Sequence, residues 1–279
     1  MTGIEWTDES WNPVTGCTKV SPGCAHCYAE SMAFRLHAMG KDGYTDKPWT
    51  QEHEAENVLL RPDRLDQPLR WRQPRRVFVN SMSDLFHTLV PFGFVDQVFG
   101  MMAGTQYIGP AVSPGHTYQI LTKRPHRMFS YLSLDRRRDW ADWGARLAGG
   151  DDPDAMYDFI SFGPSVLPNV WLGTSIEDDR HVGRADVLRE VPAAIRFVSA
   201  EPLLGPLPSL DLTGIDWLII GGESGQGHRP MDPAWVRKLV HRADRAGVAV
   251  FVKQASGGRP GQQGDLPDDL WARKEHPAA

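Results

Sequence analysis

The feature that most constrains the fold of this chain is a series of six apolar runs of strand length, separated by helical patterns and turns. The runs are apolar throughout instead of alternating with polar residues, as expected of strands that are covered on both faces. Strands that alternate with helices in this way form a parallel sheet. The runs span residues 76–81, 117–122, 169–175, 195–200, 215–222 and 248–254, and a short additional strand is expected near residues 3–6 or just before Cys17.

A group capable of chemistry follows each run. Because the carboxyl ends of all strands meet at one mouth in a β/α barrel, these side chains would converge there. We therefore predict an α/β fold that is a complete or partial β/α barrel of six to seven parallel strands. The alternative is that the polar residues only mark where each strand stops, since strand ends are polar in many folds. The groups are Asn80, Ser81, Asp84, Thr122, Lys123, Thr174, Ser175, Glu177, Ser199, Glu201, Glu223, Ser224, Lys253 and Gln254.

No linker rich in Gly, Ser or Pro and no internal repeat divides the 279 residues, so we predict a single domain over residues 1–279. The barrel core is expected at roughly residues 4–255, with a surface insertion around 136–165 and a flexible C-terminal tail over 256–279. No segment approaches the roughly 20 continuous apolar residues that a membrane span needs, and the N-terminal residues lack a signal pattern. We therefore expect a cytoplasmic protein with no membrane partner.

All three cysteines, Cys17, Cys24 and Cys27, lie within eleven positions. An odd, clustered set in a cytosolic protein is not a disulfide framework, which leaves metal ligation or redox chemistry. Zinc would take the three thiolates and a fourth ligand, for which His26 and His37 are candidates. A cubane [4Fe-4S] cluster would take the three thiolates and leave one iron free to bind a small molecule.

Six segments of the chain carry a wider pattern: EWTDESWNPVTGCTKVSPGCAHCYAE, SMSDLFH, LTKRP, LGTSIED, SAEPLLGP and GGESG. With these segments the chain resembles the radical S-adenosylmethionine superfamily, whose enzymes carry a three-cysteine loop after the first strand of a complete or partial β/α barrel. It is more closely similar to a phage-associated, largely uncharacterised family with a three-cysteine motif, from about Ile4 to Lys253. The resemblance implies that the cysteine loop lies at the C-terminal mouth of the barrel.

The resemblance also implies roles for individual residues. Cys17, Cys24 and Cys27 would ligate a [4Fe-4S] cluster that takes its electron from an external donor. S-adenosylmethionine would bind the fourth iron and supply a 5'-deoxyadenosyl radical, which removes a hydrogen from the substrate. The residues implied to contact this cofactor are Tyr28 after the third cysteine, Asn80, Ser81 and Asp84 at the methionyl end, and Thr174, Ser175 and Glu177 at the ribose.

Four charged residues at the strand ends, Lys123, Glu201, Glu223 and Lys253, are candidates for holding the substrate or moving a proton. The alternative is a structural ion pair of Lys123 with Glu201 or Glu223 inside the mouth. The superfamily places a Gly-Gly-Glu motif after its second strand to hold the methionyl amine. Here that tripeptide follows the sixth run, so the amine is not assigned to Glu223.

Six arginines and only two aspartates lie between Arg61 and Arg76, in a chain whose net charge is -5. Arginine forks match phosphate, and Trp71 offers a surface on which a base could stack. We therefore consider a nucleobase or nucleotide as the substrate, in nucleic-acid modification or repair. The alternative is a solvated loop outside the barrel. The related family also implies a partner protein, and hence a hetero-complex.

Two other functions are open from the sequence. The chain could be a zinc-binding, non-catalytic nucleic-acid-binding protein on an α/β scaffold. It could also be a β/α barrel protein whose iron-sulfur cluster is structural or senses the redox state. The identity of the ligated metal separates the first of these from the radical enzyme.

Overall fold

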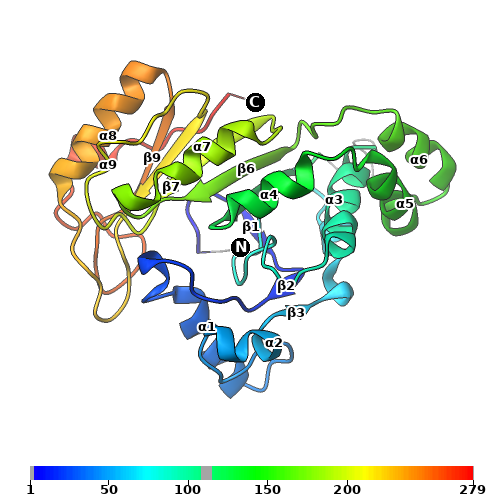
Figure 1. The fold of residues 1–279 in the computed structure, drawn as a ribbon, viewed down its shortest axis with the longest axis horizontal. Helices are drawn as coiled ribbons and strands as arrows, with labels where there is room; N and C mark the ends of the chain where they lie inside the picture. Colours follow the sequence, from blue (N-terminus) through cyan, green and yellow to red (C-terminus); the bar gives the residue numbers. More distant parts are fainter. Residues whose placement is uncertain (1–2, 108–114, 279) are drawn as a thin grey trace.

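Seven parallel strands form one curled sheet in the computed structural model, which describes residues 3–107 and 115–278 (Figure 1). The strands follow the order β1-β4-β5-β6-β7-β8-β9, and each pairs in parallel with the next. The sheet is therefore a partial β/α barrel, which confirms the predicted fold class. The strands are β1 (Glu9–Trp11), β4 (Arg76–Val79), β5 (Thr117–Thr122), β6 (Val170–Ser175), β7 (Ile195–Ala200), β8 (Trp217–Gly221) and β9 (Ala249–Gln254).

The six predicted runs each contain one of these strands, and the additional strand is β1, which lies between residues 3–6 and Cys17. Helices lie in most of the connections between strands, whereas the segment between β7 and β8 contains none. They are α3 (Phe92–Tyr107) after β4, α4 (Pro125–Leu132), α5 (Arg137–Ala148) and α6 (Pro153–Ser161) after β5, α7 (Gly183–Glu190) after β6, and α8 (Pro233–Ala246) after β8. None of the helices in the described ranges is both long enough and apolar enough to cross a membrane.

Helices α5 and α6 occupy the segment that the sequence predicted as a surface insertion. They pack beside α3, where the rings of Phe99 and Trp140 stack with their centroids 5.2 Å apart. The indole of Trp140 donates a hydrogen bond to the Tyr131 hydroxyl of α4 at 2.8 Å. This segment therefore extends the hydrophobic core outward from the sheet, to the right-hand side of Figure 1.

The chain between β1 and β4 forms a separate small unit, drawn in blue in Figure 1. Its two strands pair antiparallel, Val14 with Leu60 and Thr15 with Leu59. The elements of this unit are β2 (Val14–Thr15), the 3-10 turn η1 (Pro22–Cys24), α1 (Tyr28–Ala38), η2 (Gln51–His53), α2 (Glu54–Asn57), β3 (Leu59–Leu60), η3 (Pro62–Arg64) and η4 (Gln67–Arg70). This unit contains all three cysteines.

Alternate residues of the strands enter two separate apolar layers. One layer fills the space between the sheet and the helices and includes Val77, Tyr118, Leu172, Val198, Leu218 and Val250. The other lies on the inner, concave face and includes Trp6, Phe78, Trp171, Phe197, Trp217 and Phe251. Because the inner layer is made largely of aromatic rings, side chains fill the lower part of the barrel.

The segment 256–278, which the sequence predicted as a flexible tail, contains α9 (Asp268–Trp271) and returns along β9. Glu275 N donates to Val250 O at 2.9 Å, and the Trp217 indole donates to Glu275 O at 2.9 Å. Lys274 forms an ion pair with Glu5 at 2.9 Å. These contacts join the C-terminal segment to the N-terminal residues and to the base of the barrel.

Gly173 provides a test of the aromatic inner layer. A Cβ atom added at Gly173 would lie 2.5 Å from the ring of Phe197, so Gly173→Ala must displace that ring. We expect the free energy of unfolding to fall by about 1–3 kcal/mol, the usual cost of overpacking a core. Urea titration of the variant and the wild type measures this change.

Gly93→Ala is the matched control, because no atom lies within 4 Å of the added Cβ at this position in α3. The stability of this control should be unchanged or slightly raised, since Ala favours a helix over Gly. Equal stabilities of Gly173→Ala and the wild type would contradict the packing described for the inner face.

Candidate active site

The segment from Gly16 to Cys27, called the cysteine loop here, crosses the carboxyl end of the sheet. Gly16 N donates to Met82 O at 2.9 Å, just beyond β4. Gly16 has a φ of 78°, and a Cβ there would collide with the carbonyl of Asn57, so a glycine is required where the loop begins. Apart from the turn η1, the loop has no regular structure, and side chains from three strand ends hold it.

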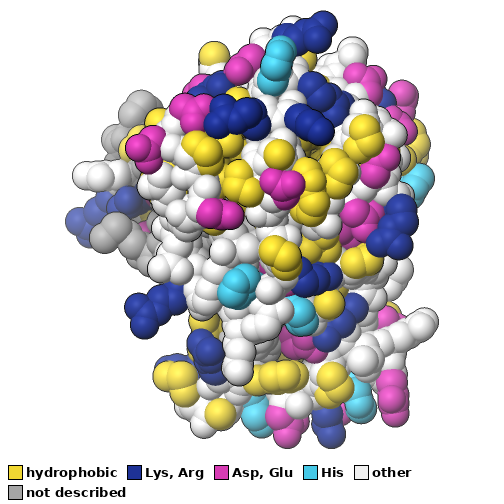
Figure 2. All heavy atoms as spheres, turned by 90° about the vertical axis from the view of Figure 1, so that its left-hand side faces the viewer, with side chains coloured by type: hydrophobic (Ala, Val, Ile, Leu, Met, Phe, Trp, Pro, Cys, Tyr) yellow, Lys and Arg dark blue, Asp and Glu magenta, His cyan; other side chains and the backbone are white. Residues whose placement is uncertain are grey.

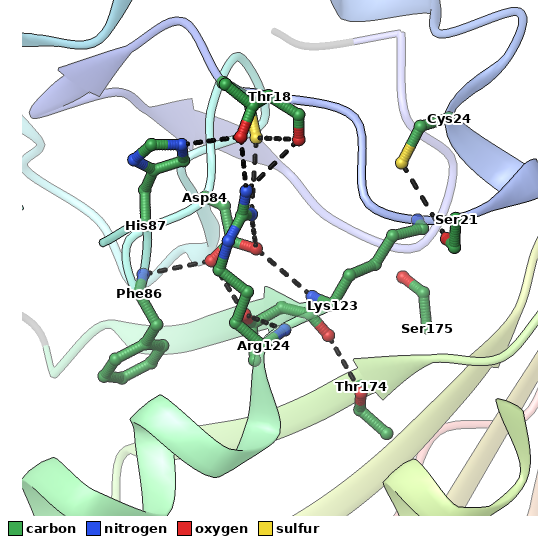
Figure 3. Close-up of polar contacts among 12 residues, drawn as sticks. Thr18, Ser21, Cys24, Asp84, Phe86, His87, Lys123, Arg124, Thr174 and Ser175 are labelled. Atoms are coloured by element: carbon green, nitrogen blue, oxygen red, sulfur yellow. Dashed lines mark hydrogen bonds and ion pairs between the residues drawn. The ribbon is translucent and has the colours of Figure 1, made fainter. Parts of the chain in front are cut away.

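Arg124, just after β5, makes the first of these attachments (Figure 3). Its Nη1 atom donates to Asp84 Oδ2 at 2.9 Å and to Cys17 Sγ at 3.5 Å. Its Nη2 atom donates to Thr18 O at 3.1 Å and to Thr18 Oγ1 at 3.0 Å. One guanidinium therefore joins the carboxylate that follows β4 to two residues of the cysteine loop.

Asp84 is itself fixed at the end of the sheet. Its Oδ1 atom accepts from the Thr122 hydroxyl at 2.7 Å and from Phe86 N at 3.0 Å, while Oδ2 accepts from Lys123 N at 3.2 Å. These donors and Arg124 occupy both carboxylate oxygens. The sequence assigned Asp84 to the methionyl end of a cofactor, whereas the observed contacts of its side chain are to the protein.

His87 completes this attachment through a hydrogen bond to Thr18. Burial and the nearby Arg124 charge lower the pKa of His87 to about 4, so its ring is neutral at pH 7. Its Nδ1 atom accepts from Leu89 N at 3.2 Å, which leaves the proton on Nε2. The ring then donates from Nε2 to Thr18 Oγ1 at 2.9 Å.

Glu177, two residues beyond β6, makes the second attachment. The carboxylate is fully buried, pairs with Arg184 at 2.9 Å and accepts from Gly23 N at 3.4 Å. A Cβ at Gly23 would lie 3.1 Å from the Glu177 carboxyl carbon, so a residue without a side chain lets the loop approach. Burial raises the pKa of Glu177, but a hydrogen bond from Ser21 and neighbouring cations, Lys123 first among them, lower it overall.

Glu223, two residues beyond β8, makes the third attachment. Its carboxylate pairs with the Arg229 guanidinium and accepts from His26 Nδ1 at 2.9 Å. Arg229 also donates to Pro22 O at 3.0 Å. Burial opposes the ionisation of Glu223, but the hydrogen bonds from Arg229 and His26 outweigh it and lower its pKa to about 2. The sequence proposed Glu223 for catalysis, and the structure engages both of its oxygens with groups that hold the loop.

The three thiols lie in the protein without a disulfide. Cys17 and Cys27 pack against a small apolar cluster that includes Trp49 and Met82. Burial and the Asp84 charge raise the pKa of Cys17 to about 12, with Arg124 acting in the opposite direction, and burial also raises the pKa of Cys27. Within the described residues, no three His, Cys, Asp or Glu side chains converge closely enough to ligate one metal ion.

The period of two along each strand determines which predicted residues face the inside of the mouth. Lys253 continues the inner face of β9 above Phe251, and Glu201 continues that of β7. Their side chains pair at 2.5 Å, Lys253 Nζ with Glu201 Oε1. A Cβ on Gly221 of the intervening strand would lie 3.1 Å from the Glu201 carboxyl carbon. An ion pair therefore spans β8 at the mouth, but it uses Lys253 and not Lys123.

Lys123 lies above Leu121 on the inner face, and its side chain extends toward Ser21 and the cysteine loop, with Ser175 nearby in the view of Figure 3. Its ammonium has no ion pair among the described residues, although its charge acts to lower the pKa values of Cys27 and Glu177. Lys123 is thus a cation placed beside the thiols and available to an anionic ligand.

Tyr28 and Ser81 are joined to one another. The Tyr28 hydroxyl donates to Ser81 O at 2.6 Å, while 49% of the Tyr28 surface is exposed. Loss of water around the hydroxyl raises the pKa of Tyr28, and the neighbouring Cys27 and Glu201 charges add to this effect. Tyr28 therefore presents aromatic surface between the third cysteine and the ion pair of the mouth.

Two predicted cofactor residues lie away from the inner face. Thr174 is buried on the helix side of β6, and its hydroxyl donates to Thr122 O at 2.9 Å. Asn80 is buried at the end of β4 in a left-handed conformation, with a φ of 62°, and its Oδ1 atom accepts from Val14 N at 3.3 Å. The alternation of inner and outer residues in β6 could have separated Thr174 from Ser175 in the sequence.

The histidines proposed as a fourth zinc ligand are both engaged elsewhere through Nδ1. His26 contacts Glu223, as described above, and His37 Nδ1 lies 3.0 Å from Tyr44 O at the far end of α1. The three arginines that attach the cysteine loop, Arg124, Arg184 and Arg229, were not identified as site residues from the sequence. Arg124 binds a carboxylate 40 residues away in the chain, whereas Arg184 and Arg229 follow Glu177 and Glu223 by seven and six residues in the same connecting segments.

Half of the six arginines in the arginine-rich segment are paired with acids. Three of its members form ion pairs: Arg61 with Asp63, Arg70 with Asp66, and Arg76 with Asp8. The Trp71 ring packs edge-on against His116 and contacts the main core. Arg72 is exposed.

The pH dependence of stability tests the Glu223 attachment. Because the folded pKa of about 2 lies below the ordinary value of 4.5, the charged carboxylate stabilises the fold above pH 4.5, and this stabilisation is lost as the pH falls toward 2. We expect Glu223→Gln to lower the free energy of unfolding by about 2 kcal/mol at pH 7 and by less at each step below pH 4.5.

Urea titrations of the wild type and Glu223→Gln between pH 7 and pH 3 measure this difference, with the exposed Glu52→Gln as the control. The control should match the wild type throughout. A deficit in Glu223→Gln that stays constant with pH would contradict the assignment.

Comparison with known proteins gives one structural and one family match. A solved structure of spore photoproduct lyase complexed with dinucleoside spore photoproduct is similar with a TM-score of 0.39 and 13% sequence identity. The match covers 83% of this chain and 59% of that chain, so it spans less than two thirds of the neighbour. No curated protein matches. The profile of the family described as "Protein of unknown function (DUF5131)" matches residues 1–266, and the chain therefore belongs to this family.

Proposed function

We propose that this protein is a radical S-adenosylmethionine-type enzyme in which Cys17, Cys24 and Cys27 hold a [4Fe-4S] cluster. The observation that carries the proposal is the attachment of the cysteine loop to three strand ends at the carboxyl end of a partial β/α barrel. When bound, the cluster and S-adenosylmethionine supply a one-electron cleavage that yields a 5'-deoxyadenosyl radical. An external low-potential donor provides the electron.

The arrangement of the thiols supports a cluster over a single zinc ion. Zinc binds sulfur at about 2.3 Å, so its thiolates must lie about 3.8 Å from one another. The described residues contain no such convergent group. In a cubane each cysteine binds a different iron, so the three sulfurs can stand further apart around a larger centre.

The remaining side chains suit the other parts of the cofactor and a substrate. Lys123 offers a charged donor for a carboxylate, and Ser175 offers a hydroxyl on the same inner face. Tyr28 offers an aromatic surface on which an adenine could lie. On this basis Glu201 and Lys253 hold or orient the substrate on the opposite side of the mouth.

Metal analysis of protein purified without oxygen tests the proposal. We expect about four irons and four sulfides per chain, lost when all three cysteines are replaced by Ala, and an electron paramagnetic resonance signal that changes when S-adenosylmethionine is added. His26→Ala should keep its iron, because His26 holds the loop through Glu223 and supplies no ligand.

Other outcomes of the same measurement would point elsewhere. One zinc and no iron, lost in His26→Ala, would replace the proposal with the zinc-binding protein. A cluster whose spectrum does not change when S-adenosylmethionine is added would indicate a structural or redox-sensing centre in place of the radical enzyme.

For the substrate we propose a nucleobase or nucleotide. Lys123 places a cation without an ion pair among the described residues on the inner face of the mouth, which suits a molecule that carries phosphate, and Tyr28 can stack on a base. If the substrate is part of a nucleic acid, Arg72 is an exposed cation of the arginine-rich segment that could contact its backbone. A partner protein in a hetero-complex could supply further contacts.

Binding of fluorescent oligonucleotides across a salt series tests the nucleic-acid form of this substrate. We expect the affinity to fall as salt rises, and Arg72→Ala to weaken binding and reduce the salt slope by about one. Arg70→Ala is the control, because Arg70 is already neutralised by Asp66 at 2.8 Å. Binding that ignores salt, or equal losses in both variants, would exclude this surface.

A further inference from the structure

Arg124 makes a contact that ligation alone does not require. We propose that Arg124 is a positioning residue that raises the electron affinity of the cluster through its hydrogen bond to the sulfur of Cys17, an inference that rests on the proposed function. The guanidinium is 11% exposed and donates to Cys17 Sγ at 3.5 Å. This contact reaches the cysteine loop from the end of β5, and Figure 3 shows Arg124 beside Thr18, the residue that follows Cys17.

The orientation of Arg124 is set by its other partners. Asp84 and the two oxygens of Thr18 accept three further hydrogen bonds from the same guanidinium. Asp84 in turn is held by the Thr122 hydroxyl, and Thr18 by the neutral ring of His87. The fork therefore cannot turn away from the sulfur without breaking several buried hydrogen bonds.

A hydrogen bond to a thiolate ligand favours the reduced state of an iron-sulfur centre. On reduction, one electron passes from a low-potential donor to the centre, which gains one negative charge while no bond breaks and no proton moves. Part of that charge resides on the cysteine sulfurs. A buried guanidinium that donates to one of them stabilises this charge more than it would in water.

The three thiols are not equivalent in this respect. Cys24 Sγ has the Ser21 hydroxyl at 3.9 Å, and among the described residues no guanidinium other than that of Arg124 donates to a cysteine sulfur. Lys could keep the charge beside Asp84 but could not span Asp84, Thr18 and Cys17 together, because its ammonium lacks the planar fork. The planar guanidinium of Arg124, and not only its positive charge, is therefore needed for the effect on the cluster.

Redox titration followed by electron paramagnetic resonance tests the inference on the cluster-loaded full chain, with dithionite as reductant and oxygen excluded. In Arg124→Met we expect the equilibrium constant for one-electron reduction to fall at least tenfold, a shift of about 59 mV to lower potential. Arg124→Lys should shift in the same direction by less. Arg127→Met is the matched control, because Arg127 lies in the first turn of α4, which begins directly after Arg124, but donates to Val90 O at 2.6 Å and makes no hydrogen bond to a cysteine among the described residues.

The possible results distinguish a failure of the proposed role of Arg124 from a failure of the proposed function. Full iron content with the same potential in the wild type and both Arg124 variants would overturn this inference and leave the proposed function standing. If Arg124→Met loses its iron because Asp84 is left unpaired, Arg124→Lys decides, and an unchanged potential there overturns the inference. An equal shift in Arg127→Met would assign the effect to long-range charge and also overturn it. Wild-type protein without iron overturns the proposed function and the inference together.

Discussion

The cysteine loop depends on three buried carboxylates that bind arginines at the ends of the strands. A segment with one 3-10 turn cannot fix three thiols by its own backbone hydrogen bonds, so it needs contacts from outside. Asp84, Glu177 and Glu223 provide them, each paired with an arginine. Removing one partner of such a pair leaves an uncompensated buried charge, which typically costs about 3–5 kcal/mol. The loop is therefore positioned by the sheet, and the placement of the thiols depends on the strand ends being in position.

This dependence changes how the polar strand ends are interpreted. They lie at the same end of the sheet, as expected of a barrel. Some of them are hydrogen-bonded within the protein, and others face the space inside the mouth. Asp84, Glu177 and Glu223 have their oxygens occupied by protein donors, whereas Lys123 and Ser175 extend inward beside the loop. The Glu201 and Lys253 pair lies on the other side of the mouth. A site that must hold a rigid reactive centre and also admit a ligand needs both kinds of group.

Much of this architecture could be predicted from the sequence, because long apolar runs and their polar ends are local signals. The six runs locate six strands, and the clustered cysteines locate the loop. The contacts of Arg124 could not be found this way, because its carboxylate partner Asp84 lies 40 residues earlier in the chain. Arg229 follows Glu223 by only six residues, but the two lie in an irregular loop that has no fixed spacing. Thr174 was assigned to the mouth because the alternation of inner and outer residues was not applied to its strand. Glu223 was proposed for catalysis because its partner Arg229 gave no sign of pairing in the sequence.

The aromatic layer on the inner face has a consequence for how this scaffold can diversify. Trp171, Phe197 and Trp217 form a solid floor beneath the mouth, and Gly173 leaves no spare volume within it. A ligand therefore binds at the rim and cannot enter the barrel. The connecting loops then make most of the contacts that recognise its shape. New reactants can then be accommodated by exchanging surface segments, while the rings below keep the geometry of the rim constant. The connecting loops can therefore vary in sequence, whereas the aromatic residues of the inner face must be preserved to keep the barrel packed.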